Sequence, residues 1–331
     1  MVISLLETVP QKVPIRPMSL QTDLNAVADL IEESFSLQQD ADGQVFLKQM
    51  RQAARDARFI SWVGSWQDLQ PATFRGFVWV EQGKVVGNIS LIPFSRQRRN
   101  IILIANVAVK QDFRRRGIAR ALTTHALRYL HQKGIKDIWL QVNAINQAAI
   151  NLYESLDFKA CCTRTTWQHK RSRMATPEDL LQDGLVLRRR KSGEDALQSL
   201  WLEEIYPNTI TWHFPIFFED FSKGIIWDPS RWIEALKLRH WALQSGDQTL
   251  GFLTWQRTDT YADNLWLAIN PQADKPAVIQ NLLMAAIPRI THKKPLSVDF
   301  PEGQASESFQ HAGFSLFRSL IWMKYLPDAS H

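Results

Sequence analysis

The sequence predicts an α/β (α+β) protein in which one arrangement, a mixed central sheet flanked by helices, is built twice. Its 331 residues correspond to about two domains at ~150 residues per domain. A composition with 45 % hydrophobic and 22 % charged residues is that of a globular protein, which excludes the disordered and fibrous classes. Strand-like and helix-like segments alternate in the first half, and the second half repeats their order as a degenerate internal repeat.

Apolar spacing and alternation define the elements of the first half. The expected helices are residues 20–35, 44–58, 117–132 and 146–156, and the expected strands are 13–19, 74–81, 85–94, 101–109, 137–142 and a closing strand pair within 158–167. The segment Ile101–Val109 is apolar on both faces, which is typical of a central strand.

A polar stretch from Lys170 to Asp183, which contains Pro177, separates the two halves and predicts domains at residues 1–172 and 173–331. The expected strands of the second half are 185–190, 241–244, 249–257, 265–270, 296–300 and one that follows Gly313, and the expected helices are 194–206 and 276–290. The repeat rests on matching segments, VVGNISLIPF with TLGFLTWQR and ESLDF with QHAGF.

Several features indicate a cytoplasmic protein that does not cross a membrane. The longest apolar run, Ile101–Val109, is interrupted by Asn106 and is far shorter than the ~20 residues of a membrane helix. The opening MVISLLETVPQK lacks the basic head of a secretory signal. The only two cysteines, Cys161 and Cys162, are adjacent, so we expect neither a disulfide nor a metal site but buried or half-buried strand thiols.

The net charge of +6 conceals two halves of opposite sign. Residues 1 to 174 carry 24 Lys and Arg against 14 Asp and Glu, whereas residues 175 to 331 carry 15 against 19. A basic half favours an anionic partner, either nucleic acid or a phosphorylated small molecule. Because no nucleic-acid-binding module is visible, we do not expect a nucleic-acid partner.

The most informative segment runs from an apolar strand through a basic loop into a helix. Unpaired backbone N–H groups and the helix dipole favour an anion at such a helix start. Gly117 and Ala119 keep side chains off the turn, and three arginines add positive charge. The alternative is a solvated basic face beside an ordinary turn. The GxxxxGK[ST] and GxGxxG phosphate-binding motifs are absent.

In this context the segment Arg114–Ala119 (RRRGIA) resembles the signature [RQ]xxGx[GA] of the GCN5-related N-acetyltransferase (GNAT) family. A strand at Trp139–Asn143 and the segment from Asn146 to Phe158 follow at the spacing of that family. Residues 70–167 look most like the ribosomal-protein alanine acetyltransferase branch, and the second half looks like a degenerate GNAT repeat.

This resemblance implies acetyl-CoA as the cosubstrate and a primary amine, on a small molecule or a protein, as the acceptor. The strand backbone would pair with the pantetheine, the helix start would hold the pyrophosphate, Asn146 would hold the pantetheine arm, and Tyr153 would protonate the leaving thiolate. The implied cofactor-binding residues are Val107, Ala108, Val109, Arg114, Arg115, Arg116, Gly117, Ile118, Ala119, Arg120 and Asn146, and the implied catalytic residue is Tyr153. Asn146 and Tyr153 are two helical turns apart, so they share one helix face. Tyr153 has an alternative interpretation as a packed aromatic side chain at a helix end.

Two positions depart from the family pattern. Gln141 occupies the place of a glutamate base and cannot accept a proton, so the base is unassigned: a water chain, Glu32 or Glu33 are the alternatives. Asp157 replaces the usual glycine of an LGF turn and predicts a reshaped helix exit. We expect His125 to be packed under its helix rather than catalytic.

These observations predict an N-acetyltransferase that works by direct attack in a ternary complex, with a catalytically silent acyl-CoA-binding or sensing module as the alternative that Gln141 suggests. The second half is expected to lack a cofactor site, because its loop 271–276 has no arginine and carries Asp274 and Pro276. That half either shapes the acceptor cleft or acts as a structural cap. Its many tryptophans either line a groove or fill the core. The oligomeric state is open, and a monomer that forms an internal pseudo-dimer is one arrangement that two repeats allow.

Overall fold

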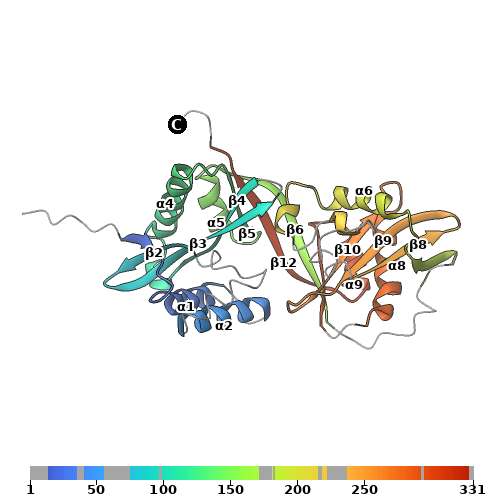
Figure 1. Cartoon of the computed structure of the whole chain (residues 1–331), viewed down its shortest axis with the longest axis horizontal. Coiled ribbons are helices and arrows are strands. Elements are labelled where there is room, and N and C mark those ends of the chain that lie inside the picture. The colour runs from blue at the N-terminus through green and yellow to red at the C-terminus, as the bar shows by residue number, and fades with distance from the viewer. Residues whose placement is uncertain are drawn as a thin grey trace, which may run out of the picture. The chain divides into compact units, whose positions relative to one another are not determined.

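The computed structural model describes residues 14–35, 41–55, 75–96, 99–170, 181, 183–214, 218–221, 237–291 and 294–327. These residues form two compact units (Figure 1). The first unit comprises residues up to Gln141, Ala148–Lys159 and the chain from Met323, and the second comprises Val142–Gln147 and Ala160–Trp322. This grouping differs from the predicted ranges 1–172 and 173–331 because the long strands that begin at Phe158 and Ser315 each continue from one unit into the other.

The first unit is a mixed sheet with helices on both faces. Its strands are β1 (Ile15–Pro17), β2 (Gly76–Glu81), β3 (Lys84–Arg96), β4 (Arg99–Val109) and β5 (Asp137–Asn143), in that spatial order. Its helices are α1 (Leu24–Ser34), α2 (Ala41–Arg55), α4 (Ile118–Gln132) and α5 (Gln147–Glu154), with a short 3-10 helix at Gln111–Phe113. Neighbouring strands are antiparallel except β4 and β5, which are parallel.

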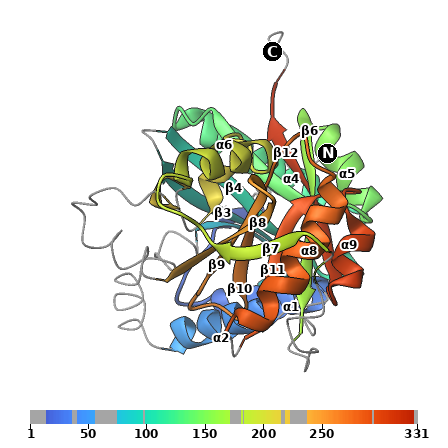
Figure 2. The same ribbon diagram turned by 90° about the vertical axis from the view of Figure 1, so that its right-hand side faces the viewer.

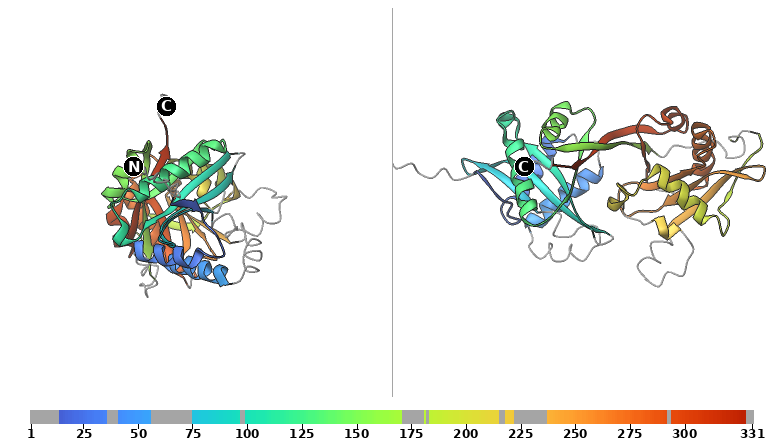
Figure 3. Two further views of the ribbon diagram at one scale, coloured as in Figure 1. Left: turned by 90° about the vertical axis from the view of Figure 1, so that its left-hand side faces the viewer. Right: turned by 90° about the horizontal axis from the view of Figure 1, so that it is seen from above.

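Local chemistry explains where these elements begin. The expected helix over 20–35 starts only at Leu24, because the buried Asp23 carboxylate accepts the Ser19 N–H at 2.7 Å and binds Arg16, which fixes a turn before the helix. Helices α1 and α2 cover one face of the sheet and α4 covers the other, as the left-hand view of Figure 3 shows. At Gly87 a Cβ atom would lie 2.9 Å from the Ile118 side chain, so glycine allows α4 to approach β3 closely.

The second unit repeats this plan (Figure 2). Its strands are β6 (Phe158–His169), β7 (Leu185–Arg189), β8 (Leu238–Ser245), β9 (Gln248–Gln256), β10 (Asp263–Ile269), β11 (Leu296–Pro301) and β12 (Ser315–Tyr325), in the spatial order β12-β6-β11-β10-β9-β8-β7. Its helices are α6 (Asp195–Ile205), α8 (Lys275–Ala286) and α9 (Ser306–His311), with 3-10 helices at Thr211–His213, Phe218–Phe221 and Ile287–Arg289. Neither α9 nor the first two 3-10 helices is predicted from the sequence.

Aromatic side chains fill the core of this unit. Six tryptophans are at most 6 % exposed, namely Trp167, Trp201, Trp212, Trp241, Trp266 and Trp322. For these residues the structure favours the core interpretation over a groove lining. Large flat side chains bury much apolar surface, which suits an irregular core.

One prediction about secondary structure is wrong. The closing strand pair within 158–167 is a single strand, β6, whose part from Arg164 to His169 pairs antiparallel with β11. The sequence pattern of Phe158–Trp167 is equally compatible with one strand or two, and only the pairing partner decides. Among the described residues, no helix combines the length and apolar character that crossing a membrane requires.

Candidate active site

In the part of the chain that the structure describes, strand β4 has one edge that lacks a strand partner beyond Ile104. On one side it pairs with β3 along its length, whereas in the described part of the chain its pairing with β5 ends at Ile104 and Leu140. Lys110 N–H donates to the Val86 carbonyl on β3. Because backbone groups alternate along a strand, those of Val109 and Val107 point away from β3, toward the edge that β5 leaves unpaired.

The predicted strand residues therefore separate into two kinds. The Val109 carbonyl lies on the free edge, where it accepts the Arg114 Nε–H at 3.0 Å. Ala108 is 2 % exposed and pairs with Asn88 on β3, so its backbone groups belong to the sheet. The positions that an extended ligand could pair with are Val107 and Val109.

The turn between β4 and α4 has the form of an anion site. Gly117 precedes α4 with φ +75°, a left-handed conformation that L side chains rarely adopt, and a Cβ there would meet no atom within 4 Å. The first intrahelical bond runs from Ala121 N–H to the Gly117 carbonyl. The N–H groups of Ile118, Ala119 and Arg120 thus have no acceptor in the helix.

Three of the four arginines around this turn have partners that brace it. Arg114 binds the Val109 carbonyl, and Arg116 donates to the Asp112 carbonyl at 3.0 Å and stacks over Phe113 at 4.9 Å. Arg120 donates to Ser155 Oγ at 2.7 Å, which ties the start of α4 to the end of α5. Arg115, at φ +61°, is exposed and has no recorded side-chain partner in the described part of the chain. All four remain exposed cations beside the turn.

Tyr153 lies on α5, two residues before Ser155, and is 7 % exposed. Its ring packs edge-on against Phe158 at 6.0 Å between centroids. Burial raises the pKa of Tyr153 to about 12, because the apolar surroundings disfavour the phenolate. The hydroxyl therefore carries its proton at neutral pH, and its packing also fits the alternative of a structural aromatic.

Two other predicted positions are exposed to solvent. Gln141 is exposed on β5. Asn146 is exposed one residue before α5, and its N–H donates to the Asn143 carbonyl at 2.9 Å. Asn146 belongs to the segment 142–147, which groups with the second unit.

The two carboxylates considered as bases differ in their surroundings. Glu32 binds Arg51 of α2 at 2.5 Å, and Arg51 also binds Asp29 at 2.8 Å. Glu33 is exposed, and its Oε1 lies 3.5 Å from the Gln111 backbone nitrogen, just beyond the end of β4. Glu33 thus has fewer ionic partners than Glu32 in the described part of the chain, and it lies near the end of β4 that leads to the glycine turn.

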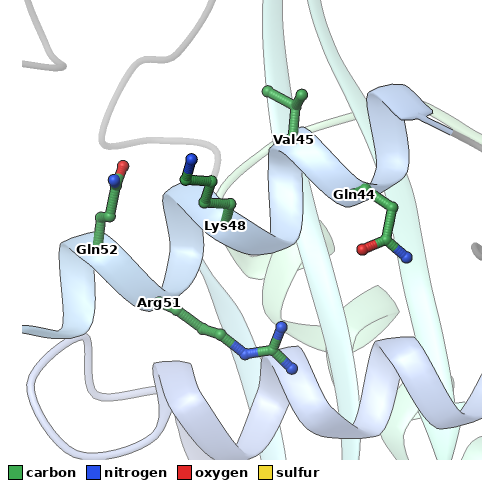
Figure 4. A pocket seen from close by; sticks show the side chains of 5 residues that line it. All are labelled: Gln44, Val45, Lys48, Arg51 and Gln52. Carbon is green, nitrogen blue, oxygen red and sulfur yellow. The ribbon is translucent and has the colours of Figure 1, made fainter.

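Helix α2 also lines a hollow of about 410 Å³ with Gln44, Val45, Lys48, Arg51 and Gln52. Figure 4 shows Arg51 turned toward the neighbouring helix, where it binds Asp29 and Glu32, while Lys48 and Val45 point to the other side. This set offers hydrogen bonds to a ligand, and it holds no histidine, cysteine or carboxylate side chain.

The remaining sequence candidates have structural roles. His125 is half-buried and packs edge-on against Phe77 at 4.5 Å, which confirms the packed interpretation. Cys162 is half-buried as expected, whereas Cys161 is exposed. The described residues contain no group of three metal-ligating side chains. Asp157 takes φ +64°, a left-handed conformation that glycine adopts more readily than other residues, and the reshaped helix exit stays a prediction.

Sequence analysis missed three polar side chains beside the free edge: Asn88, Ser90 and Asn106. Asn88 Nδ2 donates to the Asn106 carbonyl at 2.9 Å and lies 3.3 Å from Ser90 Oγ. The sequence does contain a sign of this cluster, because Asn88 and Ser90 are the polar residues of the otherwise apolar strand VVGNISLIPF and are two positions apart. A buried polar side chain in such a strand requires a partner.

Comparison with known proteins decides the family of this site. The model of the acetyltransferase (GNAT) family matches residues 31–158. The chain carries a GNAT domain. The GNAT domain is 44 % identical over 62 residues to the [ribosomal protein bS18]-alanine N-acetyltransferase of Escherichia coli K12, a match that covers 19 % of this chain and 42 % of that protein.

A second relative is the mycothiol acetyltransferase of Kocuria rhizophila, with 30 % identity over 156 residues, 46 % of this chain and 48 % of that protein. These matches span less than half the length of each relative. The GCN5-related N-acetyltransferase of Sphaerobacter thermophilus has a similar fold, with a TM-score of 0.55 at 15 % identity over 96 % of this chain and 97 % of that one. Both units thus have the GNAT fold.

Proposed function

We propose that the first unit transfers the acetyl group of acetyl-CoA to a primary amine by direct attack in a ternary complex. The observation that carries this proposal is the continuous path from the free edge of β4 into the glycine turn of α4, with Tyr153 on the helix that Arg120 joins to this turn. The acceptor is an amine of a protein or a small molecule. A cytoplasmic location stays a prediction.

The residues present fit acetyl-CoA by their chemistry. Val107 and Val109 offer backbone groups to the pantetheine amides, as a neighbouring strand would. The N–H groups of Ile118, Ala119 and Arg120 point toward an anion at the helix start, and Arg115 supplies a free positive charge for the pyrophosphate. Asn146 is assigned to the pantetheine arm from its sequence position.

The chemical step forms one bond and breaks another. The amine nitrogen attacks the thioester carbonyl carbon, the C–S bond breaks, and the sulfur takes a proton from the Tyr153 hydroxyl. The nitrogen then loses its second proton to water as the amide forms, and the Tyr153 phenolate regains a proton from water. Backbone N–H groups of β4 stabilise the charge that develops on the carbonyl oxygen. Fixing both reactants supplies much of the remaining rate by proximity.

The amine must lose a proton before it attacks, and Gln141 cannot accept one. Glu32 is neutralised by Arg51, and Glu33 stands near the pyrophosphate end of β4, so we assign proton removal to a water chain that opens to solvent. An exposed position for Gln141 gives such water access to the strand. If this assignment holds, Gln141→Glu supplies a nearer base and increases the rate.

The second candidate is a silent acyl-CoA-binding module, which the same Gln141 favours. The deciding experiment follows release of free CoA from acetyl-CoA while amines of different class are supplied. Amine-dependent CoA release supports the transferase. Tight acetyl-CoA binding without release, for every amine and also for Gln141→Glu, would favour the silent module.

A further inference from the structure

Strand β4 contains a β-bulge at the centre of its free edge. The register with β3 shifts between Asn88, which faces Ala108, and Ser90, which faces Ala105. Asn106 lies in the extra length of β4 with φ +51°, the left-handed region in which asparagine is enriched. The bulge comes two residues after the last pairing of β4 with β5, at Ile104.

A bulge leaves a carbonyl without its ladder partner, and here a side chain replaces that partner. Asn88 is fully buried and donates from Nδ2 to the Asn106 carbonyl at 2.9 Å. Its nitrogen, rather than its oxygen, must face this carbonyl, since two oxygens cannot share a hydrogen bond without a donor. Asn88 Oδ1 has no hydrogen-bond partner in the described part of the chain.

The Asn106 carbonyl and the Val107 N–H belong to one peptide group. Because a trans peptide is planar, its C=O and N–H point to opposite sides. Asn88 holds the carbonyl on the β3 side, so the Val107 N–H points toward the edge that β5 leaves open. The alternation of the strand, fixed by the Lys110 bond to Val86, gives the same direction independently.

We propose that Asn88 is a positioning residue that aims the Val107 N–H at the acyl carbonyl oxygen of the bound thioester. This inference rests on the proposed function. A hydrogen bond to the peptide carbonyl also polarises the peptide, which makes its N–H a stronger donor. The unpartnered Oδ1 is consistent with a side chain kept for its donor, because an apolar side chain of similar size would not leave a buried oxygen unsatisfied.

The test compares Asn88→Leu and Asn88→Ser with the matched control Ser90→Ala in the full-length chain. Leucine has a similar volume and removes both the donated bond and the orphaned oxygen, and serine is a second variant for the case that leucine does not fold. Ser90→Ala removes a neighbour in the same cluster but leaves the bond between Asn88 and Asn106 in place. Thermal unfolding confirms that each variant is folded.

Two readouts separate positioning from structural damage. The Asn88 variants should lower kcat by up to about 100-fold, the effect of losing an oxyanion donor completely, with acetyl-CoA affinity within ~3-fold of wild type. The carbonyl ¹³C signal of bound [1-¹³C]acetyl-CoA should move toward its free position in the Asn88 variants and stay unchanged in Ser90→Ala. The carbonyl signal reports the hydrogen bond whether or not turnover occurs.

The outcomes distinguish this inference from the proposed function. Unchanged kcat and carbonyl signal in both Asn88 variants would overturn the role of Asn88 alone. Loss of activity with equal loss in Ser90→Ala would also overturn it, since the effect would then belong to general packing. Failure of the wild-type protein to bind acetyl-CoA would overturn the proposed function, and this inference with it.

Discussion

Strands β4 and β10 hold the same place in their units, and the surroundings of their two edges differ. The similarity is close on the helix side. A Cβ at Gly87 would lie 2.9 Å from Ile118, and a Cβ at Gly251 would lie 2.9 Å from Val278, so α4 and α8 approach their sheets at the same point. The internal repeat predicted from sequence is therefore visible in side-chain packing.

On the opposite face the units diverge. The register of β9 with β10 runs without a shift from Gly251 and Ile269 to Gln256 and Asn264, whereas β4 has its bulge at Asn106. The residue that faces Ala268 is Phe252, in the position that Asn88 occupies opposite Ala108. An apolar side chain at this place accompanies a regular strand.

The second unit also fills the opening beside its strand. Tyr206 is fully buried, and its hydroxyl lies 3.5 Å from the Leu267 backbone nitrogen, one residue before Ala268. Val107 holds the matching position in the first unit. Phe214 and Trp266 pack against the Tyr206 ring. Aromatic side chains of the chain itself thus take the place that we assign to a ligand in the first unit.

In this fold, a few side chains therefore decide whether the unpaired edge of the central strand is open to a ligand or filled by the protein itself. Before α8, Asp274 stands at the cap position and Pro276 removes a backbone N–H, where the first unit has a glycine and arginines. An anion at α8 would meet a carboxylate instead of guanidinium groups. The difference between the two units can be tested by experiment.

The largest effect is expected at Gly117. Gly117→Glu places a negative side chain at the helix start and in a left-handed conformation, so acetyl-CoA affinity should fall by at least ~100-fold, about 3 kcal/mol. Calorimetric titration measures it. The control is Gly134→Glu, at the other end of α4 with φ +71° and equally open space. Equal loss in both variants would contradict an anion site at Gly117.

A smaller loss, in rate rather than binding, is expected for Tyr153→Phe. Without the phenol, kcat should fall roughly 10- to 100-fold while acetyl-CoA affinity stays within ~1 kcal/mol. Tyr325→Phe is the matched control, because Tyr325 also packs on Phe158, at 5.4 Å. A rate unchanged by Tyr153→Phe would leave Tyr153 as a packing residue only.

The pH profile gives the same assignment independently. As the pH rises, kcat/KM should increase while the amine deprotonates. Since burial raises the pKa of Tyr153 to about 12, no decline in kcat/KM is expected until the pH exceeds roughly 11. The raised pKa favours the neutral phenol in the folded state, so its stabilising contribution is present below about pH 10 and is lost toward pH 12. A descending limb near pH 9 would exclude Tyr153 as the acid.

In the second unit, Tyr206→Phe should lower the free energy of unfolding by about 1 kcal/mol, through loss of one buried hydrogen bond. Acetyl-CoA should still bind at one site per chain, because the ring continues to fill the opening. Chemical denaturation and equilibrium titration measure the two quantities. Two acetyl-CoA sites of comparable affinity in the wild-type protein would contradict the prediction that only the first unit binds acetyl-CoA.

The smallest effect is expected at Asp157, whose counterpart in the second unit is Gly313. Both residues have positive φ, +64° and +81°. Asp157→Gly should stabilise the first unit by up to about 1 kcal/mol, since glycine takes this conformation without strain. Denaturant unfolding measures the change. Destabilisation would show that the Asp157 side chain contributes more than its backbone strain costs.

Except for short elements such as α9 and for the single strand β6, the sequence predicts the order of elements, the glycine turn before α4 and the repeat. These features depend on local spacing and on single residues such as Gly117, whose conformation few other residues adopt. It also separated the charges of the two halves. It could not locate Glu32 and Glu33 relative to β4, because that depends on how α1 packs on the sheet.

The side of a strand toward which each residue directs its backbone groups depends on the tertiary structure. Ala108 and Val107 are adjacent in an apolar run, yet pairing with β3 assigns one to the sheet and the other to the free edge. Asn88 contacts the Asn106 carbonyl across 18 positions of sequence, and Tyr206 reaches Leu267 across 61. Such contacts arise from strand register and core packing, which bring together residues that are far apart in the sequence.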